Sequence, residues 1–213
     1  MFKALIFDLD GTLVDSVQDI AHALNCTLKD LSLPEKSLEE VRDIVGDGVR
    51  TLLGRATGNT KKEFVENAAQ IFHHHYRKHC VDNTFLYPGV RELLDFYKNK
   101  KLAVVSNKPY EMILQTLKHC AIENHFKLVL GPESTTNKKP HPEPILKTLE
   151  EFSVEANTTL MVGDGTTDME AGKSAGVFTC AVTYGYRKKE ELERYNPDFF
   201  IDKIEDLKKI VEE

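Results

Sequence analysis

Ala4-Leu5-Ile6-Phe7-Asp8-Leu9-Asp10-Gly11-Thr12 is the stretch that decides the fold of this chain. Its first part, from Ala4 to Phe7, is a continuous apolar run, which is typical of a strand buried on both faces of a parallel sheet. Asp8 and Asp10 follow at the carboxyl end of that strand, and Gly11 lets the chain turn there. Ligands of open α/β sheets bind in the crevice beyond these strand ends. The two acids are therefore predicted to lie in the functional site.

The rest of the chain alternates short apolar runs with segments of helical spacing. The apolar runs predict buried strands at 102–105, 128–130, 160–162 and 180–182. The intervening segments predict helices at 90–99, 110–119, 144–152 and 168–175. This alternation predicts an α/β protein with a doubly wound parallel sheet and right-handed crossovers.

One long segment, from Asp15 to about Phe85, interrupts this alternation. It contains no convincing strand run, and its apolar residues recur at helical spacing. We therefore expect a helical cap domain at 15–85, inserted into a catalytic core formed by 1–14 and 86–213. Both connections fall close to the acidic pair, so the cap can close over the site like a lid.

The composition limits the partners and the location of the protein. A length of 213 residues with 41% hydrophobic content suffices for a full core, and the net charge of −6 argues against nucleic acid as a partner. No stretch approaches the roughly 18 apolar residues of a membrane span, and the N-terminus does not resemble a signal peptide. The four cysteines form no Cys-x-x-Cys pair, so reduced structural thiols are expected. We expect a cytoplasmic protein without membrane partners.

Three further polar clusters follow predicted strands. Ser106-Asn107-Lys108 offers a hydroxyl, an amide and turn N–H groups that can surround phosphate oxygens. Lys139 lies directly before a proline-rich segment that can hold one cation in place. Asp164 and Asp168 lie on a glycine-containing turn that suits a hard divalent cation. Each cluster alone also has a plain interpretation: a loop, a helix start with exposed lysines, and a helix N-cap at Asp168.

Together the clusters resemble the haloacid dehalogenase superfamily, in which an Asp-x-Asp-Gly-Thr motif opens the chain and a Gly-Asp-x-x-x-Asp motif comes late. The resemblance covers the whole chain and implies a Rossmann-like core. It implies that Asp8 is the nucleophile and that Asp10 is the general acid and base. An acid at position 10 favours phosphate esters over halides, because a halide leaving group needs no proton.

The same resemblance assigns roles to the later clusters. Ser106 and Asn107 would bind the phosphate, and Lys139 would steady both the nucleophile and the phosphate. Asp164 would complete a Mg²⁺ site with Asp8 and the backbone carbonyl of Asp10, while Asp168 would support the residues that bind the metal. Gly165 departs from the family pattern, because relatives often carry serine or threonine at that position.

The segment Val45-Gly46-Asp47-Gly48-Val49-Arg50 looks like the cap segment of the phosphoglycolate phosphatases in this superfamily, and Tyr87-Pro88-Gly89-Val90 resembles their second hinge. Gly46 and Gly48 can expose backbone N–H groups to a small anion, and Arg50 can offer a guanidinium to a carboxylate. The alternative is a turn between helices with Arg50 in solvent.

Two other segments have weaker functional interpretations. His73-His74-His75 and His79 place two histidines one helical turn apart, which is compatible with zinc, but their neighbours favour a cap helix instead. The charge run at 187–194 mixes both signs and predicts a solvated helix rather than a basic docking surface.

We therefore expect a Mg²⁺-dependent phosphomonoester hydrolase with an aspartyl-phosphate intermediate, acting on 2-phosphoglycolate. The expected partner is a small phosphorylated metabolite, and the chain is expected to be a monomer or homodimer. Three alternatives stay open: a phosphosugar mutase of the β-phosphoglucomutase type, a phosphatase or pyrophosphatase of another small substrate, and a non-catalytic binding protein.

Overall fold

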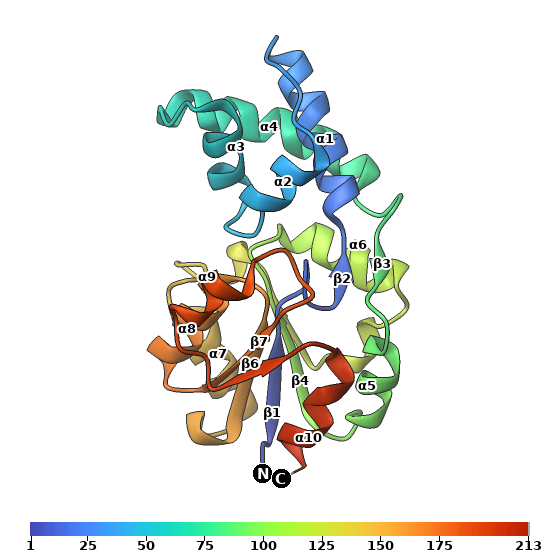
Figure 1. Cartoon of the computed structure of the whole chain (residues 1–213), viewed down its shortest axis with the longest axis vertical. Coiled ribbons are helices and arrows are strands. Elements are labelled where there is room, and N and C mark those ends of the chain that lie inside the picture. Colours follow the sequence, from blue (N-terminus) through green and yellow to red (C-terminus); the bar gives the residue numbers. More distant parts are fainter. Residues whose placement is uncertain (213) are drawn as a thin grey trace.

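The central element of the computed structural model, which describes residues 1–212, is a parallel sheet of six strands in the order β5-β4-β1-β6-β7-β8 (Figure 1). Every neighbouring pair in this sheet is parallel, so the predicted α/β class and doubly wound sheet are confirmed. Strand β1 lies between β4 and β6, and the acidic pair follows its carboxyl end. The strands are β1 (Ala4–Phe7), β4 (Lys101–Val105), β5 (Leu128–Leu130), β6 (Thr159–Gly163), β7 (Phe178–Val182) and β8 (Phe199–Ile201).

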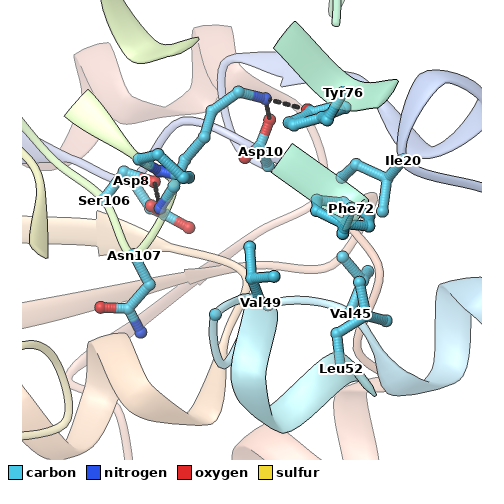
Figure 2. A pocket seen from close by; sticks show the side chains of 14 residues that line it. Asp8, Asp10, Ile20, Val45, Val49, Leu52, Phe72, Tyr76, Ser106 and Asn107 are labelled. Atoms are coloured by element: carbon cyan, nitrogen blue, oxygen red, sulfur yellow. Dashed lines mark hydrogen bonds and ion pairs between the residues drawn. The ribbon is translucent and has the colours of Figure 1, made fainter. Parts of the chain in front are cut away.

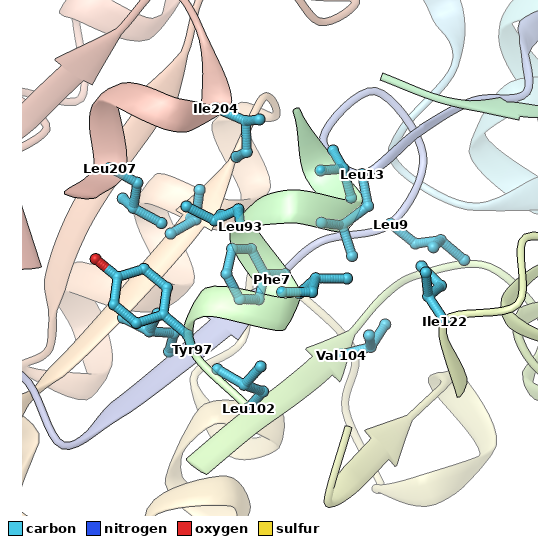
Figure 3. Packing of buried hydrophobic residues seen from close by; sticks show 14 of the residues in the cluster. Phe7, Leu9, Leu13, Leu93, Tyr97, Leu102, Val104, Ile122, Ile204 and Leu207 are labelled. Carbon is cyan, nitrogen blue, oxygen red and sulfur yellow. The ribbon is translucent and has the colours of Figure 1, made fainter. Parts of the chain in front are cut away.

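Strand β1 is apolar throughout because each of its two faces lies in a different hydrophobic cluster. Leu5 and Phe7 belong to the cluster that includes residues of α5, α6 and α10, and Figure 3 shows Phe7 beside Leu93. Ala4 and Ile6 belong to the cluster on the opposite face, which includes residues of α7 and α8. These helices are α5 (Val90–Phe96), α6 (Tyr110–His119), α7 (Glu143–Phe152), α8 (Thr166–Ala175) and α10 (Leu207–Val211).

A group of four helices lies beyond the carboxyl ends of the strands (Figure 1). Their apolar faces meet in a hydrophobic cluster of their own, to which the core contributes Met112 and Tyr186. We propose that these helices form the inserted cap at 15–85; Glu213, the last residue of the expected core, lies outside the described residues. The helices are α1 (Val17–Asp30), α2 (Leu38–Ile44), α3 (Val49–Thr57) and α4 (Lys62–His79).

The two connections between core and cap pair with each other as short strands. In this antiparallel ladder of β2 (Val14–Asp15) and β3 (Phe85–Leu86), Val14 lies opposite Leu86. The sequence did not predict these strands, because two residues are too few to show a period of two. It also missed β8 and α10, and it extended α5 to residue 99, whereas the helix ends at Phe96.

The remaining elements are short. The charge run at 187–194 contains α9 (Lys189–Glu193), and 3-10 turns lie at Glu123–His125, Pro132–Ser134, Ala156–Thr158 and Ile204–Asp206. Over residues 1–212, no helix combines the length and the apolar character that crossing a membrane requires.

A buried carboxylate fastens the start of the cap to its end. Asp19 of α1 is 1% exposed and accepts hydrogen bonds from the backbone N–H of Asn83 (2.9 Å), from the Asn83 amide (2.9 Å) and from the Thr84 hydroxyl (2.6 Å). We expect Asp19→Ala to lower the free energy of unfolding by about 2 kcal/mol, because the buried Thr84 hydroxyl and the partly buried N–H groups of Asn83 then lose their acceptor. Urea unfolding measures this loss.

Asp19→Asn is the matched control, since its amide keeps one oxygen acceptor at the same place. Its loss should be smaller than that of Asp19→Ala. If the alanine variant unfolds at the same urea concentration as the wild type, the carboxylate does not fasten the two segments.

Candidate active site

Asp8 and Lys139 meet at the end of β1. The backbone N–H of Asp8 donates to Val162 of β6 (2.9 Å), which fixes the residue directly after the strand. Lys139 is 2% exposed, and its Nζ lies 3.0 Å from Asp8 Oδ1 and 2.6 Å from Asp168 Oδ1. Burial alone would lower the pKa of Lys139, but the charges of Asp168 and Asp8 outweigh it and raise this pKa. Lys139 is therefore held as an ammonium ion against Asp8.

Three buried carboxylates, those of Asp8, Asp164 and Asp168, form one group whose oxygens lie within 4.8 Å of one another. Burial, followed by the charges of Asp8 and Asp168, raises the pKa of Asp164 to about 8. Asp164 accepts hydrogen bonds from Thr12 Oγ1 (3.1 Å) and from the backbone N–H of Tyr186 (2.8 Å). Carboxylate oxygens crowded in this way are the donor set that a hard divalent cation prefers. The residues present therefore fit such an ion.

Gly11 allows this crowding. Its φ is +85°, in the left-handed region, and a Cβ atom at this position would lie 2.2 Å from Asp164 Oδ2. A side chain here would push Asp164 out of the group, which explains why glycine follows the acidic pair.

Asp10 has one partner from the start of the cap segment and one from the core. Its Oδ1 accepts from Ser16 Oγ (2.5 Å) and from Lys108 Nζ (2.7 Å). Lys108 Nζ also donates to the hydroxyl of Tyr76 on cap helix α4 (2.6 Å), and the dashed lines in Figure 2 show both contacts of this nitrogen. Burial, with a further contribution from Asp10, raises the pKa of Tyr76 well above its usual range, so the phenol stays neutral. A cap residue is thus linked to Asp10 through one lysine.

A pocket lies between these core residues and the cap. It brings together six of the predicted site residues: Asp8, Asp10, Gly46, Gly48, Ser106 and Asn107. The cap side of the pocket is apolar, as Figure 2 shows, and is formed by Ile20, Val45, Val49, Leu52 and Phe72. The space above Asp8 and Asp10 therefore suits a small group with few hydroxyls.

The two predicted phosphate ligands differ in how they are held. Ser106 Oγ accepts from the backbone N–H of Lys108 (3.3 Å) and lines the pocket. The amide nitrogen of Asn107 donates to the carbonyl of Lys139 (3.0 Å), and in Figure 2 this amide points away from Asp8. Asn107 Oδ1 is buried and has no hydrogen-bond partner among residues 1–212. Asn107 thus holds the Lys139 loop, and its contact with phosphate stays a prediction.

Arg50 is not brought into the pocket. Its side chain is 65% exposed and forms an ion pair with Glu66 of α4 through two hydrogen bonds, of 2.6 and 2.8 Å. The guanidinium that the sequence offered to a substrate carboxylate is therefore satisfied on the cap surface. Nothing in this geometry supports the proposed contact between Arg50 and the substrate.

The segment with Gly46 and Gly48 is held by two core side chains. Arg187 donates to the backbone carbonyls of Asp43 (2.5 Å) and Val45 (2.7 Å), and Lys138 donates to the carbonyl of Asp47. A Cβ atom on Gly48 would lie 2.5 Å from Lys138 Nζ. The second glycine thus gives this lysine room to reach the loop.

Asp168 and Gly165 form a hydrogen bond at the start of α8. Asp168 Oδ2 accepts from the backbone N–H of Gly165 (2.9 Å), while its Oδ1 pairs with Lys139. Asp168 therefore accepts a hydrogen bond at the start of the helix and pairs with Lys139 at the same time. Gly165 contributes its backbone N–H to this contact.

The histidine run lies on α4, as expected. His75 pairs with Asp30 and His79 pairs with Asp82, both at 2.7 Å. Among residues 1–212, the one group of carboxylate, imidazole or thiol ligands close enough to hold a metal is that of Asp8, Asp164 and Asp168.

Several site residues were missed by sequence reasoning. Lys108 and Thr12 lie inside motifs that were recognised, but only the neighbouring residues were given roles. Tyr76 had no signal beyond its helical position. Tyr186, whose hydroxyl accepts from the backbone N–H of Ser16 (2.9 Å), lies 170 residues away in the sequence, and no local pattern connects the two.

The comparisons with known proteins agree with this geometry. Residues 5–182 match the family model described as haloacid dehalogenase-like hydrolase. The phosphoglycolate phosphatase of Aquifex aeolicus is 41% identical over 99% of this chain and 97% of that protein, and that of Colwellia psychrerythraea is 36% identical over 96% and 95%. The crystal structure of a predicted phosphoglycolate phosphatase from Haemophilus somnus superposes with a TM-score of 0.91 at 33% identity, covering 98% of this chain and 97% of that one.

Proposed function

The chain belongs to the haloacid dehalogenase-like hydrolases and is a phosphoric monoester hydrolase; from this premise we propose that it converts 2-phosphoglycolate and water to glycolate and phosphate. The observation that carries the proposal is the placement of Asp8, Asp10 and Lys139 under a small pocket with an apolar cap wall. The names of the relatives at 41% and 36% identity support the same substrate.

Asp8 is the proposed nucleophile. In the first half-reaction a carboxylate oxygen of Asp8 attacks phosphorus, the bond from phosphorus to the ester oxygen breaks, and an aspartyl-phosphate forms. Lys139 holds Asp8 Oδ1 and so orients the carboxylate for this attack. Asp10 gives its proton to the leaving oxygen, which departs as the alcohol of glycolate.

Asp10 acts again in the second half-reaction. As a carboxylate it takes a proton from a water molecule, whose oxygen attacks phosphorus and releases Asp8 and inorganic phosphate. The hydrogen bond from Ser16 at 2.5 Å keeps the Asp10 side chain in place for both steps. Asp8 thus carries the phosphoryl group and Asp10 transfers the proton, and a single residue separates the two acids.

A divalent cation, proposed to be Mg²⁺, fits the group of Asp8, Asp164 and Asp168, to which the backbone carbonyl of Asp10 would add a fourth oxygen. When bound, the ion neutralises charge on the phosphoryl oxygens. The chain places four carboxyl groups here, those of Asp8, Asp10, Asp164 and Asp168, beside the two ammonium groups of Lys108 and Lys139. A bound cation would hold the carboxyl groups of its ligands in their ionised form and offset their charge toward an anionic substrate.

Two of the three alternative functions, the mutase and the non-catalytic binding protein, fit the pocket less well. A phosphosugar mutase must form hydrogen bonds with several sugar hydroxyls, but the cap wall here is apolar. A binding protein without activity would not need Lys139 aligned on Asp8 beside a carboxylate at Asp10. The pocket favours a small ester with a short carbon chain.

The test is phosphate release by the purified protein from 2-phosphoglycolate, glucose 1-phosphate, a nucleoside monophosphate and pyrophosphate, in Mg²⁺ or in excess EDTA. We expect the highest kcat/KM with 2-phosphoglycolate, loss of turnover in EDTA, and recovery when Mg²⁺ is restored. Isomerisation of the sugar phosphate without net phosphate release would support the mutase instead. No phosphate release from any ester would remove the enzymatic proposal.

A further inference from the structure

We infer that Lys108 recognises the carboxylate of the substrate and so determines specificity, an assignment that rests on the proposed function. Among the described residues that line the pocket, Lys108 is the single one with a positively charged side chain. The two acids of the lining repel a carboxylate, and the remaining residues are neutral. For a substrate with a carboxylate beside its phosphate, Lys108 is therefore the cation that these lining residues provide.

Lys108 has a hydrogen-bond donor to spare. A lysine ammonium carries three N–H donors. Asp10 takes one at 2.7 Å and Tyr76 takes a second at 2.6 Å, and no third partner of Lys108 Nζ occurs within residues 1–212. The side chain is 2% exposed, so bulk water does not compete freely for this third donor. The free N–H belongs to a side chain that lines the pocket.

The chemistry of the ester places its carboxylate near this nitrogen. Asp10 must lie within hydrogen-bond reach of the leaving oxygen in order to protonate it. In 2-phosphoglycolate that oxygen is bonded to a CH₂ group that carries the carboxylate. The carboxylate therefore lies one carbon away from the atom that Asp10 serves, and the nitrogen of Lys108 lies 2.7 Å from Asp10.

The cap fixes the position of the ammonium group. Tyr76 comes from α4, its hydroxyl accepts from Lys108 Nζ, and its ring centroid lies 5.0 Å from that nitrogen. Tyr76 is fully buried and packs against Phe72 of the apolar wall. Lys108 is thus held between core and cap, so its charge is presented to the pocket only when the cap stands where the structure has it.

The apolar wall makes this cation selective. A carboxylate that leaves water gains a charge-assisted hydrogen bond from Lys108. A sugar hydroxyl that enters the same space meets Val45, Val49 and Leu52 and loses its hydrogen bonds to water. The combination admits a short acid and disfavours a polyhydroxylated leaving group.

The test compares two esters of similar size in wild type and Lys108→Met: 2-phosphoglycolate, and ethyl phosphate, which lacks the carboxylate. The variant also removes a hydrogen-bond partner of Asp10, and that loss affects the turnover of both esters. The ratio of their kcat/KM values therefore measures the contribution of the substrate carboxylate. We expect the ratio to fall about 30- to 100-fold, chiefly through a higher KM for 2-phosphoglycolate. Lys108→Arg should recover part of the ratio.

Arg50→Ala is the matched control, because it removes a cation that belongs to the cap but does not line the pocket; its ratio of kcat/KM values should equal that of the wild type. Equal losses on both esters in Lys108→Met would reduce Lys108 to a residue that positions Asp10, and the inference would fall alone. A wild-type enzyme without preference for 2-phosphoglycolate over ethyl phosphate would remove the proposed substrate and this inference together. Circular dichroism and urea unfolding establish that each variant is folded.

Discussion

Asp8→Asn is expected to abolish turnover, with a loss of about 10⁴-fold or more in kcat, while the fold stays intact. The amide has the shape of the carboxylate but cannot attack phosphorus. Its oxygen still accepts a hydrogen bond from Lys139, which also keeps its partner Asp168. The substitution therefore removes the nucleophile with little disturbance of its surroundings. Phosphate release under saturating substrate and Mg²⁺ measures the effect.

A direct trap for the covalent intermediate strengthens this experiment. Wild-type enzyme mixed with labelled substrate and quenched in acid should retain label on the protein, and Asp8→Asn should retain none. Asp95→Asn, at an exposed carboxylate that pairs with His125 far from the pocket, serves as the matched control and should behave as wild type. Near-normal turnover in the Asp8 variant would show that another group attacks phosphorus.

Asp10→Asn is expected to show losses that depend on the leaving group. With 2-phosphoglycolate, whose alkoxide needs a proton, kcat should fall about 10³-fold. With 4-nitrophenyl phosphate, whose leaving oxyanion is stable, the first half-reaction should be much less affected. Ser16 and Lys108 can still donate to the amide oxygen, so the side chain keeps its place.

The second half-reaction gives this variant a further signature. Without the Asp10 carboxylate, water lacks its base, so the aspartyl-phosphate should accumulate when an aryl ester reacts. Rapid mixing should then show a burst of nitrophenol equal to the enzyme concentration, followed by slow turnover. Equal losses on both esters, with no burst, would count against the role of Asp10 as acid and base.

The fold could be predicted well where a residue's environment is set by local pattern. β1 is apolar at every position because both of its faces are covered, and such a run is visible in the sequence. Parallel strands end at the same edge of the sheet, so the residues after β1, β4 and β6 could be expected to meet. Asp8 after β1 lies close to Asp164 after β6, and Ser106 after β4 lines the same pocket as Asp8, in agreement with that expectation.

The contacts that the sequence did not predict join distant segments. Arg50 was assigned to the substrate because its segment resembles a family motif. Its partner Glu66 lies on a different helix, and no local pattern shows that the two side chains face each other. Lys108 could be placed at a strand end, but its bond to Tyr76 exists only because the cap packs there. The ladder of β2 and β3 likewise arises from two connections that are brought together by the rest of the fold.

The way the cap loop is fastened has a consequence for how such an enzyme can change. Arg187 and Lys138 donate three hydrogen bonds to backbone carbonyl oxygens, those of Asp43, Val45 and Asp47, and Arg187 also forms an ion pair with the Asp47 side chain at 3.7 Å. Every amino acid has the carbonyl oxygen, so the three hydrogen bonds do not depend on which side chains the loop carries. Substitutions at position 45 can therefore change the wall of the pocket while these hydrogen bonds hold the loop in place. New substrate preferences can then arise without a change in the contacts between the cap loop and the core.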